Sequence, residues 1–259
     1  MNILNLRNNT LYNILRIIER EWKHLLANKL YLFTNSLSFI VQTFIYAFIL
    51  NYLIPSLNYM QYYAIGMSVL TLWSFSMFTA WSVSGERQSG MVDYYLSLPI
   101  KKSEYVIGRM LGSTFRNLIY IAPFLLIILL IVGVPNIINL LLIIGILVIF
   151  GLGLSGFAIT LGSLIKSVMV LDFLIGIIDI FMIRLSTIYY PESAMMFWMK
   201  LASRLNPLTH ASDLLRYSTG VQQITNITYP VLYLIIFSVG LMTISLKLYI
   251  SKLEGGKFS

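Results

Sequence analysis

Long runs of apolar residues alternate with short polar or charged segments along the whole chain. Six of these runs are long enough to cross a bilayer as helices, since a spanning helix needs roughly 20 apolar residues. They cover residues 30–54, 59–83, 105–132, 139–162, 168–188 and 229–250. The pattern therefore predicts an all-α integral membrane protein with six transmembrane helices.

The segment before the first run predicts an amphipathic helix. Between Leu11 and Asn28, apolar residues recur at three- and four-residue steps, and charged residues fill the opposite side. Mixed charge and the single tryptophan Trp22 are typical of a helix lying in the plane of the membrane interface. A soluble helix packed on its own domain is the alternative, but the sequence offers no soluble domain to receive it. We therefore divide the chain into an interfacial helix at 1–29 and a transmembrane domain at 30–259.

A charged segment interrupts the apolar runs at residues 84–104. Its charges cannot lie cheaply in hydrocarbon, so we expect the segment in water. Apolar residues between Met91 and Leu98 would form one side of a short helix, which Pro99 would end. The segment thus predicts an amphipathic helix at the membrane surface, a shape that a soluble partner can grip.

A second polar segment, residues 189–228, precedes the last run. It holds two helical stretches too short to span, and Asn206 with Pro207 forces a turn between them. Arg216 lies in the second stretch, which ends at Gly220. This pattern predicts a re-entrant pair of half-helices.

Basic residues indicate the orientation. The short loops at Pro55 and Pro135 carry no lysine or arginine, whereas the alternate loops and both ends of the chain carry many. The positive-inside rule then places both termini and residues 84–104 in the cytoplasm and residues 189–228 outside. The long outer segment holds the exceptions, which are Lys200, Arg204 and Arg216.

Composition supports a membrane protein over a soluble one. The mean hydropathy is +0.81 and only 11% of residues are charged, against about 25% in soluble domains. The net charge of +8 comes from residues that flank apolar runs, so the expected partner is a lipid bilayer and not a nucleic acid. The chain has no cysteine and therefore no disulfide.

The sequence lacks the motifs of bond-making chemistry. No Gly-x-x-x-x-Gly-Lys-Ser/Thr loop occurs, so we expect no ATP site in this chain. The glycine-rich run from Gly151 to Phe157 lies inside a predicted span and favours close helix packing, as do Gly108 and Gly112. The two histidines, His24 and His210, fall on opposite sides of the membrane, so we expect no metal site. A solvated or helix-capping role is expected for His210.

Two groups of residues resemble the ABC-2-type exporter permeases. The first group is Glu86-Arg87, Gly90, Leu96-Ser97-Leu98-Pro99-Ile100, Lys102, Glu104, Tyr105, Gly108 and Arg109. The second is Asn206-Pro207-Leu208-Thr209-His210 followed by Leu215-Arg216. Their order and spacing agree with the six-span layout.

The resemblance implies a transport subunit that is not itself an enzyme. A cytoplasmic coupling helix would contact a separate ABC ATPase through residues Glu86, Arg87, Gly90, Tyr95, Leu98 and Pro99. Two copies of that ATPase would bind ATP and Mg, and a second permease, identical or related, would complete the pathway in the cell membrane. The cargo would be amphipathic, lipid-like, drug-like or a glycan. A non-transport subunit that recruits an ATPase and a secondary transporter stay open as alternatives.

Four ionisable residues lie within predicted spans and are candidates for function: Arg116, Asp172, Asp179 and Arg184. Asp172 and Arg184 lie near span ends, where they can reach water. Arg116 and Asp179 lie at one depth, about 16 Å from the cytoplasmic ends of their spans. We predict that these two residues pair, or else that they face an aqueous pathway between two subunits.

Overall fold

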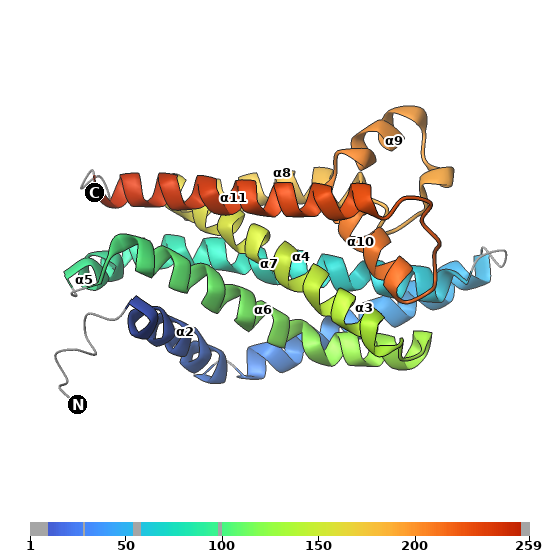
Figure 1. Ribbon diagram of the computed structural model, residues 1–259, viewed down its shortest axis with the longest axis horizontal. Helices are drawn as coiled ribbons and strands as arrows, with labels where there is room; N and C mark the ends of the chain where they lie inside the picture. Colours follow the sequence, from blue (N-terminus) through green and yellow to red (C-terminus); the bar gives the residue numbers. More distant parts are fainter. Residues whose placement is uncertain (1–9, 28, 54–57, 98–99, 255–259) are drawn as a thin grey trace.

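The structure is a computed structural model that describes residues 10–27, 29–53, 58–97 and 100–254 (Figure 1). Within these residues every regular element is a helix. The helices are α2 (Thr10–Ala27), α3 (Lys29–Leu53), α4 (Tyr59–Gln88), α5 (Met91–Ser97), α6 (Lys102–Val132), α7 (Ile137–Leu164), α8 (Val168–Arg184), the 3-10 helix η1 (Glu192–Ala194), α9 (Phe197–Arg204), α10 (Pro207–Ser218) and α11 (Thr228–Glu254).

The predicted all-helical membrane architecture is confirmed in its main outline. Among the described residues, α4, α6, α7 and α11 are both long and apolar enough to cross a membrane. The 25-residue α3 and the 17-residue α8 coincide with two further apolar runs. That these two helices also cross, which would give six spans, stays a prediction.

Helix α4 forms the centre of the bundle. It contacts α3, α6, α7, α8 and α10, and most of its residues are buried, including Trp73 and Phe75. Helix α7 lies between α4 and α11 and makes its most extensive contacts with these two helices. The glycine prediction is confirmed here, because a Cβ at Gly153 would lie 2.7 Å from Ser238 Cα on α11.

The two ends of the bundle differ in structure. Helix α5, the start of α2 and the C-terminal end of α11 lie at one end, shown at the left of Figure 1. Helices α9 and α10 lie at the other end. The predicted short helix after residue 90 and the two short helices on either side of Asn206 are therefore both present, and they occupy opposite ends.

Helix α2 packs lengthwise against α6 through its less apolar side. Ile17 and Glu21 are buried against α6, where Gly108 and Gly112 leave room for them. Leu11, Leu15 and Leu26 on α2 are exposed, and Trp22 is 41% exposed, with its ring 5.9 Å from that of Phe115 on α6. The outward side of α2 is therefore suited to lipid.

Candidate functional site

A sharp reversal after α4 creates the separate helix α5. The amide of Ser89 donates to Gly85 O at 3.0 Å and that of Gly90 donates to Arg87 O at 3.2 Å. Gly90 has φ +71, and a Cβ there would meet nothing within 4 Å. A left-handed backbone, and not a close contact, therefore explains the glycine.

Helix α5 has one anchored side and one free side. Val92 is 2% exposed, and the Tyr95 ring contacts both the Arg20 guanidinium, 4.6 Å from its centre, and the Tyr105 ring, whose centre is 5.7 Å away. Met91 and Tyr94 point away from the bundle and are 47% and 62% exposed. Leu98 and Pro99, expected in the coupling segment, lie outside the described residues.

A buried cluster of charges joins α2 to α6. Glu21 Oε2 lies 2.6 Å from Arg116 Nη1, and Glu21 Oε1 lies 2.9 Å from Arg109 Nη1. All three side chains are at most 3% exposed. Charges this close and this well shielded are strongly coupled, so the loss of one leaves the others without compensation.

The same cluster continues to α4 through Glu86. Glu86 Oε1 accepts a hydrogen bond from Arg109 Nη1 at 2.7 Å and another from Arg20 on α2. Arg109 Nη2 also donates to Ser82 Oγ at 2.9 Å, and Arg116 Nη2 donates to Thr79 Oγ1 at 3.0 Å. We call these five charged residues the junction cluster: Arg20, Glu21, Glu86, Arg109 and Arg116. Three arginines and two glutamates give it a formal charge of +1 when both carboxylates are ionised.

Arg87 points the other way, toward the end of α7. Its Nη1 donates to Ser163 O at 3.2 Å and to Ile165 O at 3.4 Å. Carbonyls at a helix C-terminus carry partial negative charge and favour such a cation. Glu86 and Arg87 are thus placed against the protein's own helices, and Met91 and Tyr94 form the exposed side of α5. That Glu86, Arg87, Gly90 and Tyr95 contact an ATPase stays a prediction.

The predicted pair of Arg116 with Asp179 is wrong. Arg116 binds Glu21, and Asp179 Oδ1 accepts a hydrogen bond from Trp73 Nε1 at 2.6 Å. The reason is that α8 lies against α4 and not against α6, whereas α2 delivers a carboxylate directly to Arg116. Also on α8, nearer its start, Asp172 Oδ1 accepts a hydrogen bond from the indole Nε1 of Trp81.

Arg184 remains near the end of its helix, as predicted. It is exposed, and its guanidinium lies 5.2 Å from the centre of the Tyr189 ring. This contact is a cation–π interaction at the end of the bundle that carries α9 and α10.

At that same end, Asn206 fixes the turn between α9 and α10. Its Oδ1 accepts from Leu208 N at 2.9 Å as an N-cap, with Pro207 in the first turn. Its Nδ2 donates to Met182 O at 2.7 Å on α8. His210 Nε2 lies 2.8 Å from Arg204 O, the last carbonyl of α9, so the capping alternative holds for this histidine. Burial lowers the pKa of His210, which keeps the ring neutral at pH 7.

Arg216 is the most enclosed cation at this end. Its side chain is fully buried, donates to Thr187 O at 2.8 Å and to Tyr62 O at 3.2 Å, and pairs with Asp213 at 3.0 Å. Its guanidinium also stacks on the Tyr62 ring, 3.5 Å from the centroid. Burial raises the pKa of Asp213, and Arg216 opposes that rise. Arg216 therefore joins α10 to α4 and to the segment after α8.

The sequence singled out neither Glu21 nor Arg20 for the site. The signal that could have found Glu21 is its spacing with Ile17, four residues apart on α2, which matches the spacing of Gly108 and Gly112 on α6. The side chains of Ile17 and Glu21 would then pack into the space left by the two glycines.

Comparison with known proteins shows the family of this chain. The model of the ABC-2 type transporter family matches residues 12–219, well over half of the chain. The chain belongs to the ABC-2 type transporter family, whose members are membrane subunits that generally act with an ABC ATPase. No curated protein matches the chain.

Proposed function

We propose that the chain is the permease subunit of an ATP-driven exporter, and that α5 is where its ATPase binds. The observation that carries this proposal is the build of α5: a free side with Met91 and Tyr94, and an anchored side that Val92 and Tyr95 hold against the bundle. A soluble partner needs accessible side chains to grip. The attachment through Val92 and Tyr95 would transmit a movement of the partner to the bundle.

The junction cluster supplies the route for that force. Tyr95 on α5 contacts Arg20 on α2, Arg20 pairs with Glu86 on α4, and Arg109 on α6 binds that same glutamate. A displacement of α5 therefore acts on three helices together, as rigid-body movement of packed elements requires. ATP and Mg would stay on two partner ATPase subunits, and this chain would convert their closure into a change of access.

A second permease subunit, identical or related, would complete the pathway. Gln42 lies in the middle of α3 and its amide side chain is exposed, as are the apolar neighbours Val41 and Ile45. An amide facing hydrocarbon is costly, so this side of α3 is better suited to water or to another chain. The pathway we propose runs beside α3 and α8 and suits an amphipathic, lipid-like, drug-like or glycan cargo.

We propose that the protein lies in the cytoplasmic membrane, with α5 and both termini in the cytoplasm. Since the chain has no cysteine, single cysteines can report this directly. In intact cells, Gln223→Cys should react with a membrane-impermeant maleimide, whereas Lys101→Cys should react only after the cells are opened. Labelling of Lys101→Cys in intact cells would refute the orientation.

Loss of the Tyr94 ring is expected to weaken ATPase binding. Tyr94→Ser removes a large exposed aromatic from α5, and such anchors typically carry 2 kcal/mol or more, roughly a thirtyfold change in affinity. The measurement is the amount of ATPase that co-purifies with the permease from membranes.

The matched control is Tyr52→Ser, at the far end of α3, where the ring is 87% exposed. This change should leave the ATPase yield unchanged. Equal ATPase yields from both variants and the unmodified protein would remove α5 as the binding site.

A further inference from the structure

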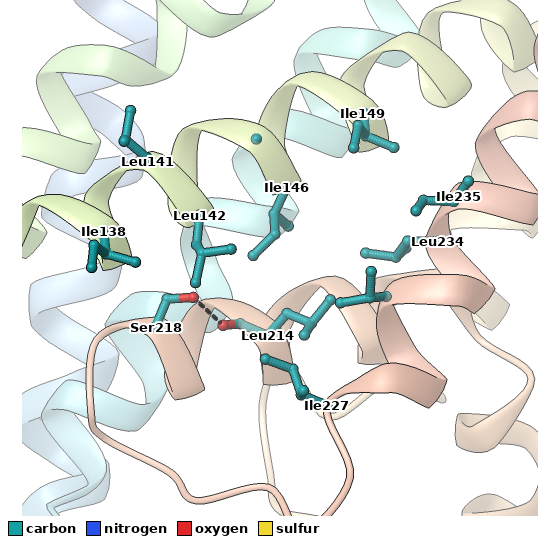
Figure 2. Close-up of a pocket in the computed structure, with 12 residues that line it drawn as sticks. Ile138, Leu141, Leu142, Ile146, Ile149, Leu214, Ser218, Ile227, Leu234 and Ile235 are labelled. Atoms are coloured by element: carbon teal, nitrogen blue, oxygen red, sulfur yellow. Dashed lines mark hydrogen bonds between the residues drawn. The ribbon is translucent and has the colours of Figure 1, made fainter.

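A cavity of about 360 Å³ lies between α7, α10 and α11, apart from the junction cluster and from α5. Figure 2 shows α7 along one side, α11 along the other, and α10 closing the third. Its lining consists of Ile138, Leu141, Leu142, Gly145, Ile146, Ile149, Leu214, Ser218, Ile227, Val231, Leu234 and Ile235.

The chemistry of this lining excludes a polar occupant. Ten of the twelve residues are aliphatic, and the one hydroxyl, Ser218 Oγ, already donates to Leu214 O at 2.9 Å (Figure 2). A bound water needs two to four polar partners, and this lining does not offer them. The cavity therefore fits hydrocarbon.

The size and depth of the cavity narrow the occupant further. On α7 the lining extends from Ile138 to Ile149, about 16 Å at 1.5 Å per residue, or half of a hydrocarbon core of roughly 30 Å. A helix of that length and about 10 Å width would occupy more than roughly 1000 Å³, so a helix of a second copy is too large to enter. A single hydrocarbon chain is narrow enough.

The cavity is continuous with the surface of two helices that are long and apolar enough to cross the membrane. Leu214 and Leu234 are buried at its base, whereas Ile138 and Leu141 at its rim are 68% and 62% exposed. A lipid in the surrounding leaflet can therefore enter sideways without passing a polar barrier.

We infer that this cavity binds one acyl chain of a membrane phospholipid, from the leaflet at the α9–α10 end. The acyl chain contacts Leu214 and so holds α10 against α7 and α11. This contact lies on the side of α10 away from the buried Arg216. The bound lipid is a structural ligand of the α10 helix, independent of ATP and of the ATPase.

Gly145 offers a way to fill the cavity without disturbing the backbone. A Cβ at Gly145 would meet nothing within 4 Å, so Gly145→Phe places its ring in the open space of the cavity. Gly240 on α11 is the matched control, because a Cβ there also meets nothing within 4 Å and the residue lies outside the lining.

The test uses the purified permease in phosphatidylcholine vesicles that contain a phosphatidylcholine with a diazirine midway along one acyl chain. After irradiation, labelled peptides are identified by mass spectrometry. We expect label on the segments that contain Leu142, Leu214 and Val231. Gly145→Phe should lower this labelling about tenfold, the factor for roughly two displaced methylene groups, and Gly240→Phe should leave it unchanged.

A second probe tests the unmodified protein alone. A phosphatidylcholine with its diazirine on the headgroup should leave the Leu214 peptide unlabelled, because the headgroup stays at the surface. The inference is overturned if the acyl probe labels only other faces of the bundle, such as Val41 on α3. It is also overturned if Gly145→Phe labels as strongly as the control.

Discussion

Replacing Glu21 with glutamine is expected to lower the free energy of unfolding by about 3–5 kcal/mol, the cost of breaking a buried ion pair on one side. Glu21 is the carboxylate that both Arg109 and Arg116 bind, at 2.9 and 2.6 Å. Without its charge, the guanidinium of Arg116 is left with neutral acceptors, which are the new amide oxygen and the Thr79 hydroxyl. The measurement is unfolding of the purified permease in mixed micelles with increasing denaturing detergent.

Glu19→Gln is the control on the same helix. Glu19 pairs with Arg16 and Lys23 on the exposed side of α2, where water and salt screen the charges. Little change in stability is expected there. If Glu21→Gln were as mild as Glu19→Gln, the junction cluster would not be what holds α2 to α6.

Replacing Arg216 with alanine should cause a loss of similar size at the opposite end of the bundle. The change removes the cation that pairs with Asp213, whose side chain is 22% exposed, and it removes the donors to Thr187 O and Tyr62 O. An uncompensated buried charge costs about 3–5 kcal/mol. Arg216→Lys should recover only part of this, since an ammonium cannot reach several acceptors as a planar guanidinium does.

Arg204→Ala provides the comparison for Arg216. Arg204 pairs with Glu192 at 2.9 Å, but its side chain is 66% exposed. Exposed pairs contribute about 0–1 kcal/mol, so thermal unfolding of this variant should stay close to that of the unmodified protein. An equal loss in both variants would show that burial of Arg216 does not set its importance.

The order of the helices could be predicted from the sequence because hydrocarbon restricts what a spanning segment can be. Apolar runs predicted the ranges of the long helices, and the residues from Gly90 to Pro99 indicated a separate short helix between two of them. Asn206 with Pro207 likewise indicated the turn between α9 and α10, since both residues act through local backbone geometry.

Side-chain partners could not be predicted in the same way. The apolar pattern gives the depth of a residue in the membrane, but not the direction in which it points or which helix lies beside it. Arg116 and Asp179 share a depth, yet α6 faces α2 at Arg116, and α8 faces α4 at Asp179. The decisive partner, Glu21, comes from a helix before the first apolar run, so depth arguments had no place for it.

The same limitation affected the expected coupling residues. Glu86 and Arg87 are polar residues beside a membrane surface, which suggested an exposed role. In the structure, Glu86 is part of the junction cluster, and Arg87 donates to carbonyls at the end of α7. Local sequence could not reveal that Arg20 and Arg109, from two other helices, would bind Glu86, or that carbonyls at the end of a third helix would accept from Arg87.

The most direct test of the central claim, that α5 is where the ATPase binds, is a cross-link from α5 itself. Tyr94→Cys and Thr225→Cys, exposed at opposite ends of the bundle, would each be treated in native membranes with a short bifunctional maleimide–photoreactive reagent. The partners would then be identified by peptide mass spectrometry. We predict that Tyr94→Cys captures a protein with a Gly-x-x-x-x-Gly-Lys-Ser/Thr loop and that Thr225→Cys captures none. Capture of such an ATPase from Thr225→Cys, or its absence from Tyr94→Cys, would contradict the account.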